Sequence, residues 1–288
     1  MNETIRKKKK WWEIVLTVLL CLCVFATSVL GILQLGVVYT ERFWEYWSPD
    51  YAKEDILPIL QKETLTDEDY QTLYKQTGLT KLGIDDCREK NDLKRVLDIQ
   101  TFFFEEHEMT IEPFAPFTYL ETIEEYATMA YLRDGDILVS ATTRVSWWRY
   151  GHAALVVDGE NSLIVESLSP GMNSKLSSAR TFADLADFLI LRPKADKEVR
   201  TEVAAYAKEN LIGIPYQMTT GILTKKFEEG VTAPARSQCA HLVWYAYKKF
   251  GFDLDSNGGL SVKPQDIALS DQVEVVQAFG FDLDELWS

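Results

Sequence analysis

Cysteine and histidine are the scarcest reactive residues in this sequence, with four and three copies among 288 residues. Cys21 and Cys23 fall within a long apolar run, which leaves Cys87 and Cys239 as the only other thiols. Two thiols are too few for a disulfide framework, although an oxidising environment would allow this pair to form one bond. The histidines and cysteines lack the spacing of a zinc site, and no glycine-rich phosphate loop is present. We therefore expect no metal and no other cofactor.

Basic residues are also under-represented, because 30 lysines and arginines face 44 aspartates and glutamates and the formal net charge is −14. Five of the basic residues, Arg6 and Lys7 to Lys10, are gathered near the N-terminus, so the rest of the chain is even more acidic. Nucleic-acid binding depends on basic patches that neutralise phosphates. The composition therefore excludes nucleic acid as an expected partner, and it identifies no protein partner.

One apolar run is unusually long, since no charged residue occurs from residue 14 to residue 40. About 20 apolar residues let a helix cross the hydrocarbon core of a membrane, so we predict a transmembrane helix over 14–40 that anchors the chain in the cell membrane. Aromatic residues on both sides of the run match the interfacial belts of such helices: Trp11 and Trp12 before it, and Phe43, Trp44, Tyr46 and Trp47 after it. The lysine cluster predicts a cytoplasmic segment 1–13, which places the rest of this single-pass protein at the bacterial cell surface.

A cleaved signal peptide is the alternative to an anchor, because it has the same basic start and Ala26-Thr27-Ser28 resembles a cleavage site. The apolar run continues well beyond this tripeptide. This continuation favours an uncleaved membrane anchor.

Residues 41–130 are predicted to form a mainly helical subdomain outside the membrane. Thr66-Asp67-Glu68-Asp69 has the pattern of a helix cap and first turn, and another helix is expected to begin near Asp92. Nothing in this region indicates a role.

Residues 131–288 are predicted to form a separate domain with strands. "DGDILVSA" indicates a turn and a strand, "GHAALVVDGENSLIVES" a β-hairpin, and "DFLILRP" a third strand. Helices are expected at "KEVRTEVAAYAKENLIG" and from about Gln238 to Phe250. Strands followed by helices are typical of an α+β fold with a small antiparallel sheet packed on helices.

Cys239 is predicted to lie in the first turn of the second of these helices. Leu242, Val243 and Ala246 follow it at helical spacing, so the thiol shares their inward face. Cysteines in such positions commonly only fill a core. If the first turn opens on a cleft, however, the free N–H groups and the positive end of the helix dipole stabilise a thiolate nucleophile.

A nucleophilic cysteine needs a base, and only three histidines are available. His241 is two residues from Cys239 and therefore points to nearly the opposite side of the helix. His107 stands among Glu105, Glu106 and Glu108, which is typical of a surface position. His152 opens a predicted strand directly after Gly151, where its side chain can emerge at the end of a sheet.

Glu166 is the candidate for the group that orients His152. If Asp158-Gly159-Glu160 forms a three-residue hairpin loop, His152 falls directly opposite Glu166, whereas a two-residue loop places Ser167 there. A carboxylate at the end of an otherwise apolar strand favours the first register, because buried carboxylates are rare unless paired.

Four segments in this order resemble the circularly permuted papain-like amidases of the NlpC superfamily, the YaeF/YiiX type. They are "DGDILVS", "GHAALVVDG…LIVES", "GIPYQ" and "QCAHLVWYAYKKFG" followed by "VKPQDIALSD", and together they cover about half of the chain. The resemblance implies a permuted papain-like fold in which the histidine precedes the cysteine. It also implies that Cys239 is the nucleophile, His152 the base and Glu166 the orienting residue, with Tyr216 lining the substrate site. Gln217 and the pair Ala240-His241 depart from the family pattern, which leaves substrate specificity open.

The expected function is a membrane-anchored cysteine hydrolase, an amidase or peptidase that forms a thioacyl-enzyme on Cys239, with cell-wall peptides as one substrate class. The order of motifs also resembles lecithin:retinol acyltransferase-like proteins, which act on lipid acyl groups. In that alternative Trp147 and Trp148 border an acyl-binding slot. Two further alternatives are an inactive membrane-anchored binding module and a structural disulfide between Cys87 and Cys239.

Overall fold

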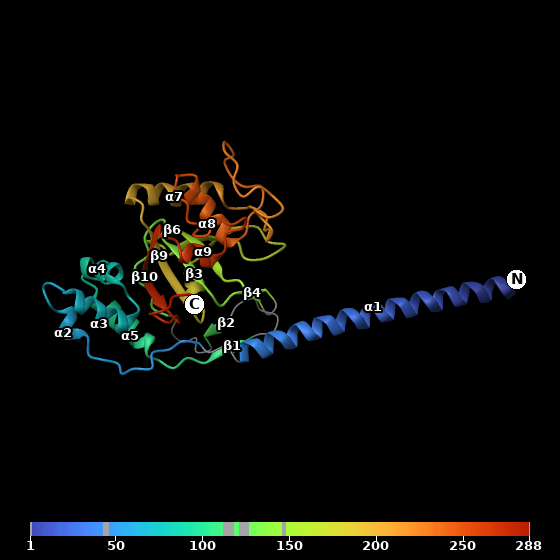
Figure 1. Ribbon diagram of the computed structural model, residues 1–288, viewed down its shortest axis with the longest axis horizontal. Coiled ribbons are helices and arrows are strands. Elements are labelled where there is room, and N and C mark those ends of the chain that lie inside the picture. Colours follow the sequence, from blue (N-terminus) through green and yellow to red (C-terminus); the bar gives the residue numbers. More distant parts are fainter. Residues whose placement is uncertain (1, 43–45, 112–117, 121–126, 146–147, 288) are drawn as a thin grey trace.

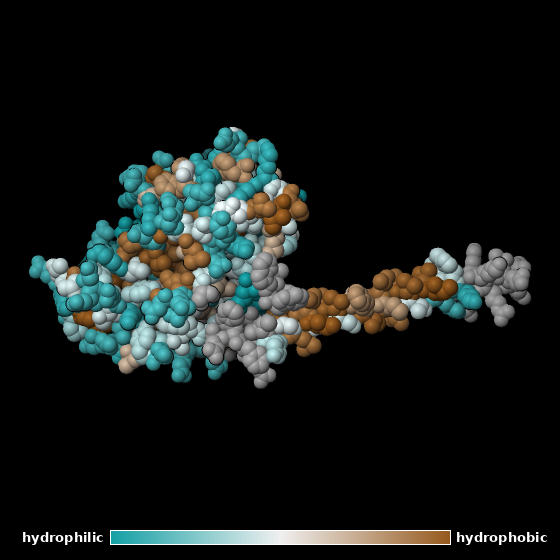
Figure 2. Space-filling view, in the orientation of Figure 1, coloured by the Kyte–Doolittle hydropathy of each residue, from teal (hydrophilic) through white to brown (hydrophobic). Residues whose placement is uncertain are grey.

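A long N-terminal helix and an α+β domain make up the computed structural model, which describes residues 2–42, 46–111, 118–120, 127–145 and 148–287 (Figure 1). Helix α1 (Asn2–Arg42) contains a stretch from Lys10 to Val37 with a mean hydropathy of 2.6, and its residues are largely exposed, with Val37 at its end buried. This stretch is the brown rod in Figure 2, and it contrasts with the largely hydrophilic surface of the domain. It is long and apolar enough to span a membrane.

A six-stranded antiparallel sheet in the order β10-β9-β3-β6-β7-β8 forms the centre of the domain. The expected antiparallel α+β architecture is therefore confirmed. The strands are β3 (Ile137–Ser140), β6 (His152–Asp158), β7 (Leu163–Glu166), β8 (Lys175–Ser178), β9 (Phe188–Pro193) and β10 (Val273–Phe279). The sequence did not indicate β8, which is exposed on most residues, or β10, which follows after two further helices.

Helices cover both faces of this sheet. Leu138, Ala154 and Ile190 share one core with the helices of the N-terminal region, which are α2 (Leu57–Leu60), α3 (Asp67–Thr77), α4 (Lys81–Glu89) and α5 (Leu93–Phe103). Val139 and Leu155 on the opposite face share a second core with α7 (Lys197–Asn210) and α8 (Cys239–Lys248). Because both faces are covered, the central strands are almost continuously buried rather than alternating.

Four short elements complete the domain around the sheet. They are the two-stranded sheet of β4 (Arg144–Val145) with β5 (Trp148–Arg149), and the helices α6 (Arg180–Ala183) and α9 (Pro264–Ala268).

The two helix starts expected in the N-terminal region are confirmed. Thr66 and Asp69 form a reciprocal capping box on α3, and Asp92 caps α5 by accepting a hydrogen bond from the Arg95 N–H at 3.1 Å. The region also contains a short hairpin that the sequence did not indicate, of β1 (Met109–Ile111) with β2 (Thr118–Leu120).

The expectation that His107 is a surface histidine is wrong. The helix α5 ends at Phe103, and the chain then turns so that the His107 ring stacks on Phe102, with 4.3 Å between ring centroids. Its Nε2 atom also lies 3.0 Å from the Phe102 carbonyl oxygen, so the side chain is half-buried and remote from Cys239.

Two of the aromatic residues after α1, Tyr46 and Trp47, contact the domain. The Trp47 ring packs against Phe103 at 5.6 Å, and the Tyr46 hydroxyl accepts a hydrogen bond from Arg149 at 2.9 Å. Phe43 and Trp44 lie outside the described residues.

Candidate active site

Cys239 is the first residue of helix α8, and the side chain of Gln238 caps this helix. The Gln238 Oε1 atom accepts hydrogen bonds from the Ala240 N–H at 2.9 Å and from the Cys239 thiol at 3.3 Å. The Gln238 Nε2 atom donates to the Val262 carbonyl oxygen at 2.5 Å, which ties the cap to the loop before α9. This double anchoring fixes the position of the Cys239 sulfur at the start of the helix.

The surroundings of α8 are more apolar than its sequence pattern suggested. Leu242, Val243 and Ala246 pack inward with Cys239, as expected, but every residue from 239 to 247 is buried. The sheet, α7 and the segment that precedes α8 enclose the helix, so it has no solvent-facing side in its first two turns.

His152 begins strand β6, and the backbone before it requires glycine. Gly151 has a φ of +84°, and a Cβ atom there would approach the Ser140 carbonyl oxygen at 2.9 Å. This tight turn brings the His152 ring against Phe182, with 5.4 Å between ring centroids. The imidazole is thereby held at the end of the sheet with only 2% of its surface exposed.

Glu166 does contact His152, although the expected strand register is wrong. Ala154, not His152, lies opposite Glu166, because β6 has an irregularity between Val156 and Asp158 and the loop after it is longer than three residues. A shift of two residues keeps both side chains on one face of the sheet, and diagonal neighbours remain within reach of long side chains. The His152 Nε2 and Glu166 Oε2 atoms are 2.9 Å apart.

The ionisation of the histidine and the glutamate supports an ion pair. Burial lowers the pKa of His152, but its hydrogen bonds with the side chains of Cys239 and Glu166 outweigh this and raise it to about 9. Burial raises the pKa of Glu166, but the His152 hydrogen bond and charge bring it below its ordinary value, with smaller contributions from Ser177 and Lys175. His152 is therefore protonated at neutral pH, with Nε2–H directed at Glu166 and the other ring nitrogen left for the thiol.

Two tyrosines flank the thiol. Burial, followed by the charge of Cys239, raises the pKa of both Tyr150 and Tyr216, so both phenols are neutral donors near the sulfur. Tyr216 thus lies near Cys239, and a backbone bridge joins it to Ser237. Tyr150 was not foreseen; it extends from the turn before His152 toward the Val262 carbonyl oxygen, with its hydroxyl 3.4 Å away.

The N-terminus of α8 offers a donor for a developing oxyanion. Within the described ranges the Cys239 N–H makes no hydrogen bond, whereas the Ala240 N–H is capped by Gln238. A free first-turn N–H group adjoining a nucleophile is the geometry that stabilises a tetrahedral intermediate.

His241 does not take part in this arrangement. Its Nδ1 atom lies 2.8 Å from the Ser237 hydroxyl and its Nε2 atom 2.7 Å from the Lys226 carbonyl oxygen. Burial lowers the pKa of His241 to about 4, so it is a neutral core residue at physiological pH.

Cys87 and Cys239 are both free thiols and occupy different cores. Cys87 packs with the N-terminal helices on one face of the sheet, and Cys239 packs with α7 and α8 on the other. The structural disulfide considered from the sequence is therefore not formed in this fold.

A cavity of about 1150 Å³ approaches the site but stops short of the thiol. Tyr150, Gly151 and Asp187 line it, while Cys239, His152 and Glu166 do not. Cys239 and Glu166 are each only 3% exposed, so the three side chains are closed off, and Tyr150 is the lining residue whose pKa responds to the charge of Cys239.

Asp187 is a second titratable group beside the site, and the sequence reasoning missed it. Its Oδ1 atom accepts hydrogen bonds from Ala141 N–H at 2.7 Å and from the hydroxyl of Ser140, the cross-strand neighbour of His152, at 2.8 Å. Burial raises the pKa of Asp187 to about 6. The only signal in the sequence was an acidic residue directly before the apolar strand "FLILRP".

The structure brings Cys239, His152, Glu166 and Tyr216 together, but it does not place every predicted site residue. Trp148 lies in β5, and its side chain is outside what the structure describes, as is Trp147 altogether. In the described part of the chain, no group of three or more histidines, cysteines or carboxylates is arranged to hold a metal ion.

Comparison with known proteins adds no assignment. The sequence matches no model of a known protein family, and no curated protein matches it significantly. The geometry of the site itself consists of a buried thiol, imidazole and carboxylate that contact one another in this order at the N-terminus of α8.

Proposed function

We propose that this chain is a membrane-anchored cysteine hydrolase with a permuted papain-like fold, acting as an amidase or peptidase. The observation that carries the proposal is the series Cys239–His152–Glu166, in which the carboxylate holds the imidazole at 2.9 Å and the imidazole bonds to a thiol at a helix N-terminus. A cysteine whose only role is packing needs neither a protonated partner nor a carboxylate behind that partner. The order of the residues, with histidine before cysteine, also agrees with a permuted topology.

In the proposed reaction the Cys239 thiolate attacks the substrate carbonyl carbon and forms a C–S bond. The Cys239 N–H stabilises the negative oxygen, and a phenol such as that of Tyr216 is the natural second donor; one such donor typically contributes about 3 kcal/mol. Protonated His152 donates its proton to the leaving amine as the C–N bond breaks. Neutral His152 then deprotonates a water molecule, which attacks the thioester and releases the acid and the free thiol.

Glu166 supports both steps because it stabilises the imidazolium that alternates with neutral imidazole. Its carboxylate is itself buried and paired, so it cannot move away to solvent. The cavity that Tyr150 and Gly151 line is the proposed route for substrate, because Tyr150 also lies within the electrostatic influence of Cys239.

Helix α1 would place this site at the cell surface. Its lysine-rich start and the uncharged stretch from residue 14 to residue 40 support an orientation with the domain outside the cytoplasm. Peptides of the cell wall are then the nearest amide substrates, and lipid acyl groups are the alternative. The same intermediate, a thioester on Cys239, forms in both cases.

The test is the rate at which iodoacetamide alkylates Cys239 in the full chain in detergent, measured by peptide mass between pH 6 and 9. Cys87 is an internal control, because burial raises its pKa to about 11 and keeps it a thiol. We expect Cys239 to react far faster than Cys87, and His152→Ala to slow it by roughly 100-fold, the usual contribution of a positioned base. His241→Asn, which changes a buried histidine on the same helix, should leave the rate near that of the wild type.

If Cys239 remains unmodified at every pH while the protein is folded, the hydrolase proposal fails and a binding module is the better description. If Cys239 is reactive, incubation with muropeptides and with phospholipid vesicles separates the two substrate classes. An acyl adduct on Cys239 that forms only with phospholipid would replace the amidase with a lipid acyl hydrolase or acyltransferase.

A further inference from the structure

A second cavity, of about 890 Å³, lies between the N-terminal helices and the far end of the sheet. Its walls come from the loop before β3, the turn between β6 and β7, α6 and the first turn of α7. Six cationic side chains line it, against three acidic ones: Lys90, Arg95, Arg133, Arg180, Lys197 and Arg200. This local excess of positive charge is notable in a chain with a net charge of −14.

Arg200 is the most constrained of these cations. Only 9% of it is exposed, one of its terminal nitrogens donates to the Ala195 carbonyl oxygen at 2.5 Å, and Nε has no partner among the described residues. The neighbouring carboxylate of Asp136 accepts hydrogen bonds from Arg192 at 2.9 and 2.8 Å and from the Arg133 N–H at 2.9 Å, but from no Arg200 nitrogen. A buried guanidinium is always charged, so an unmade hydrogen bond there is costly and favours a bound anion.

The start of α7 adds further donors at the same cavity. Asp196 precedes the helix without forming a side-chain cap, so the first-turn N–H groups have no acceptor from that residue. Lys197 is exposed in the first turn and forms no ion pair with any described residue. The positive end of a 14-residue helix favours phosphate-like anions.

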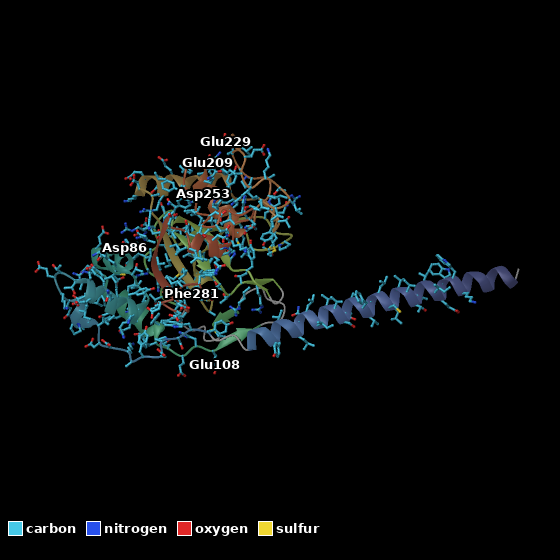
Figure 3. The ribbon with its side chains drawn as sticks, viewed as in Figure 1. Asp86, Glu108, Glu209, Glu229, Asp253 and Phe281 are labelled. Carbon is cyan, nitrogen blue, oxygen red and sulfur yellow. The ribbon has the colours of Figure 1, made fainter. Side chains whose placement is uncertain are left out.

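Three of the other cations in the wall of the cavity already contact carboxylates or an aromatic ring. Arg133 pairs with Asp86, labelled in Figure 3, and with Glu89. The Arg95 guanidinium and the Lys90 Nζ atom lie 4.0 and 4.7 Å from the centroid of the Tyr131 ring, and Arg95 also pairs with Asp92. Arg133 and Arg95 are therefore engaged by carboxylates, whereas Arg200 and Lys197 lie together in the first turn of α7 and form no ion pair in the described ranges.

The cavity is separate from the candidate active site. Strand β6 runs from His152 at the site to Asp158, next to Gly159 of the cavity, and its length at about 3.3 Å per residue is roughly 20 Å. In Figure 1, α4 and α7 lie on the side of the molecule away from α1. A ligand would thus arrive from the aqueous side.

We propose that this cavity is a binding site for a phosphate-bearing anion, held by Arg200, Lys197 and the N-terminus of α7. The site is independent of the chemistry at Cys239. Its position favours a soluble or polymeric phosphate over a lipid headgroup of the membrane that α1 would enter.

The test is calorimetric titration of the full chain in detergent with inorganic pyrophosphate at low and at physiological ionic strength. We expect saturable binding whose affinity decreases as the salt concentration rises. The affinity for pyrophosphate should fall about tenfold or more in Arg200→Gln and in Lys197→Gln, because one hydrogen bond to a charged group contributes about tenfold in affinity. Lys208→Gln is the matched control, because it removes the same charge from the same helix outside the cavity. Lys197 is exposed, so its variant keeps the test valid if the Arg200 variant folds poorly.

Equal affinity in the Lys197 and Lys208 variants, or no pyrophosphate binding by the wild type, overturns the proposal. A parallel titration with dihexanoyl phosphatidylglycerol below its micelle concentration distinguishes the source of the phosphate. Weaker binding of this lipid than of pyrophosphate supports a ligand from the aqueous side, and the reverse order overturns that part of the proposal.

Discussion

At the scale of single residues, His152 and His241 have opposite ionisation although both are buried histidines near Cys239. His152 has a carboxylate and a thiol as neighbours, which raise its pKa, whereas His241 faces a hydroxyl and a carbonyl near the Lys226 charge, and burial dominates. Their protonation could not be read from the sequence, because it depends on which polar groups the fold brings within about 3 Å.

Glu166→Gln should destabilise the protein in a particular pH window. The pKa of His152 is raised from 6.5 to about 9, so its stabilising contribution is complete below pH 6.5 and is lost as pH rises through 9. The pKa of Glu166 is lowered from 4.5, so its contribution is present above pH 4.5 and is lost on further acidification. Denaturant unfolding of both proteins from pH 4 to 10 should show the largest difference, about 3 kcal/mol, between pH 4.5 and 6.5. A difference that does not vary with pH would contradict the ion pair.

The sequence was sufficient to select Cys239, His152 and Glu166 as neighbours. The contact between His152 and Glu166 was predicted from a register of β6 and β7 that the structure does not have. A slip of two residues preserves the face of each side chain, so the contact survived the error, whereas a slip of one residue would have abolished it. Asp187 was not foreseen because it precedes β9, whose place beside β3 depends on the strand order. Tyr150 was not foreseen because its approach to Cys239 depends on how α8 packs on the sheet.

At the scale of elements, the start of α8 depends on Gln238. This residue caps the Ala240 N–H, accepts from the thiol and reaches Val262, so it joins helix, nucleophile and loop. An amide side chain can make all of these bonds at once, because it has an acceptor oxygen and a donor nitrogen.

Gln238→Ala should therefore affect both stability and reactivity. We expect a loss of about 1–2 kcal/mol, as for other caps, together with slower alkylation of Cys239 because the sulfur loses its anchor. Thr66→Ala is the matched control, since it removes the cap of α3, which is remote from the thiol, and should lower the stability without changing the alkylation rate. Identical alkylation rates in the two variants would show that the cap does not position the nucleophile.

At the scale of the whole molecule, the N-terminal helices and the sheet are not independent. The Gly78–Thr80 segment pairs with β10 through hydrogen bonds from Ala278 N–H to the Gly78 carbonyl oxygen at 2.9 Å and from Thr80 N–H to the Val276 carbonyl oxygen at 3.0 Å. It thereby covers the edge strand, which would otherwise expose unpaired backbone groups. Acidic side chains lie on the N-terminal region, such as Glu108, and on the part that contains α7 and α8, such as Glu209, Glu229 and Asp253 (Figure 3).

Gly78→Ala tests whether the two parts form one cooperative unit. Gly78 has a φ of +69°, and a Cβ atom there would lie 1.9 Å from the Ala278 carbonyl oxygen. We expect a loss of several kcal/mol, against about 1–2 kcal/mol for Gly213→Ala, which has a similar φ of +87° but no atom within 4 Å. Hydrogen exchange should show α3–α5 and α8 losing protection together in Gly78→Ala. Loss confined to the N-terminal helices would show that the sheet domain is stable without them.

The sequence by itself determined the apolar helix, the α+β class and the capped starts of α3 and α5, and it selected a cysteine and a histidine that the fold brings together. Each of these follows from local patterns: hydrophobic period, capping residues and the scarcity of reactive side chains. The tertiary structure alone decided that helices cover both faces of the sheet, that β10 joins its edge, and that Cys239 and Cys87 lie in separate cores. These features depend on contacts between residues far apart in the chain. The free energy of such contacts cannot be inferred from a local sequence pattern.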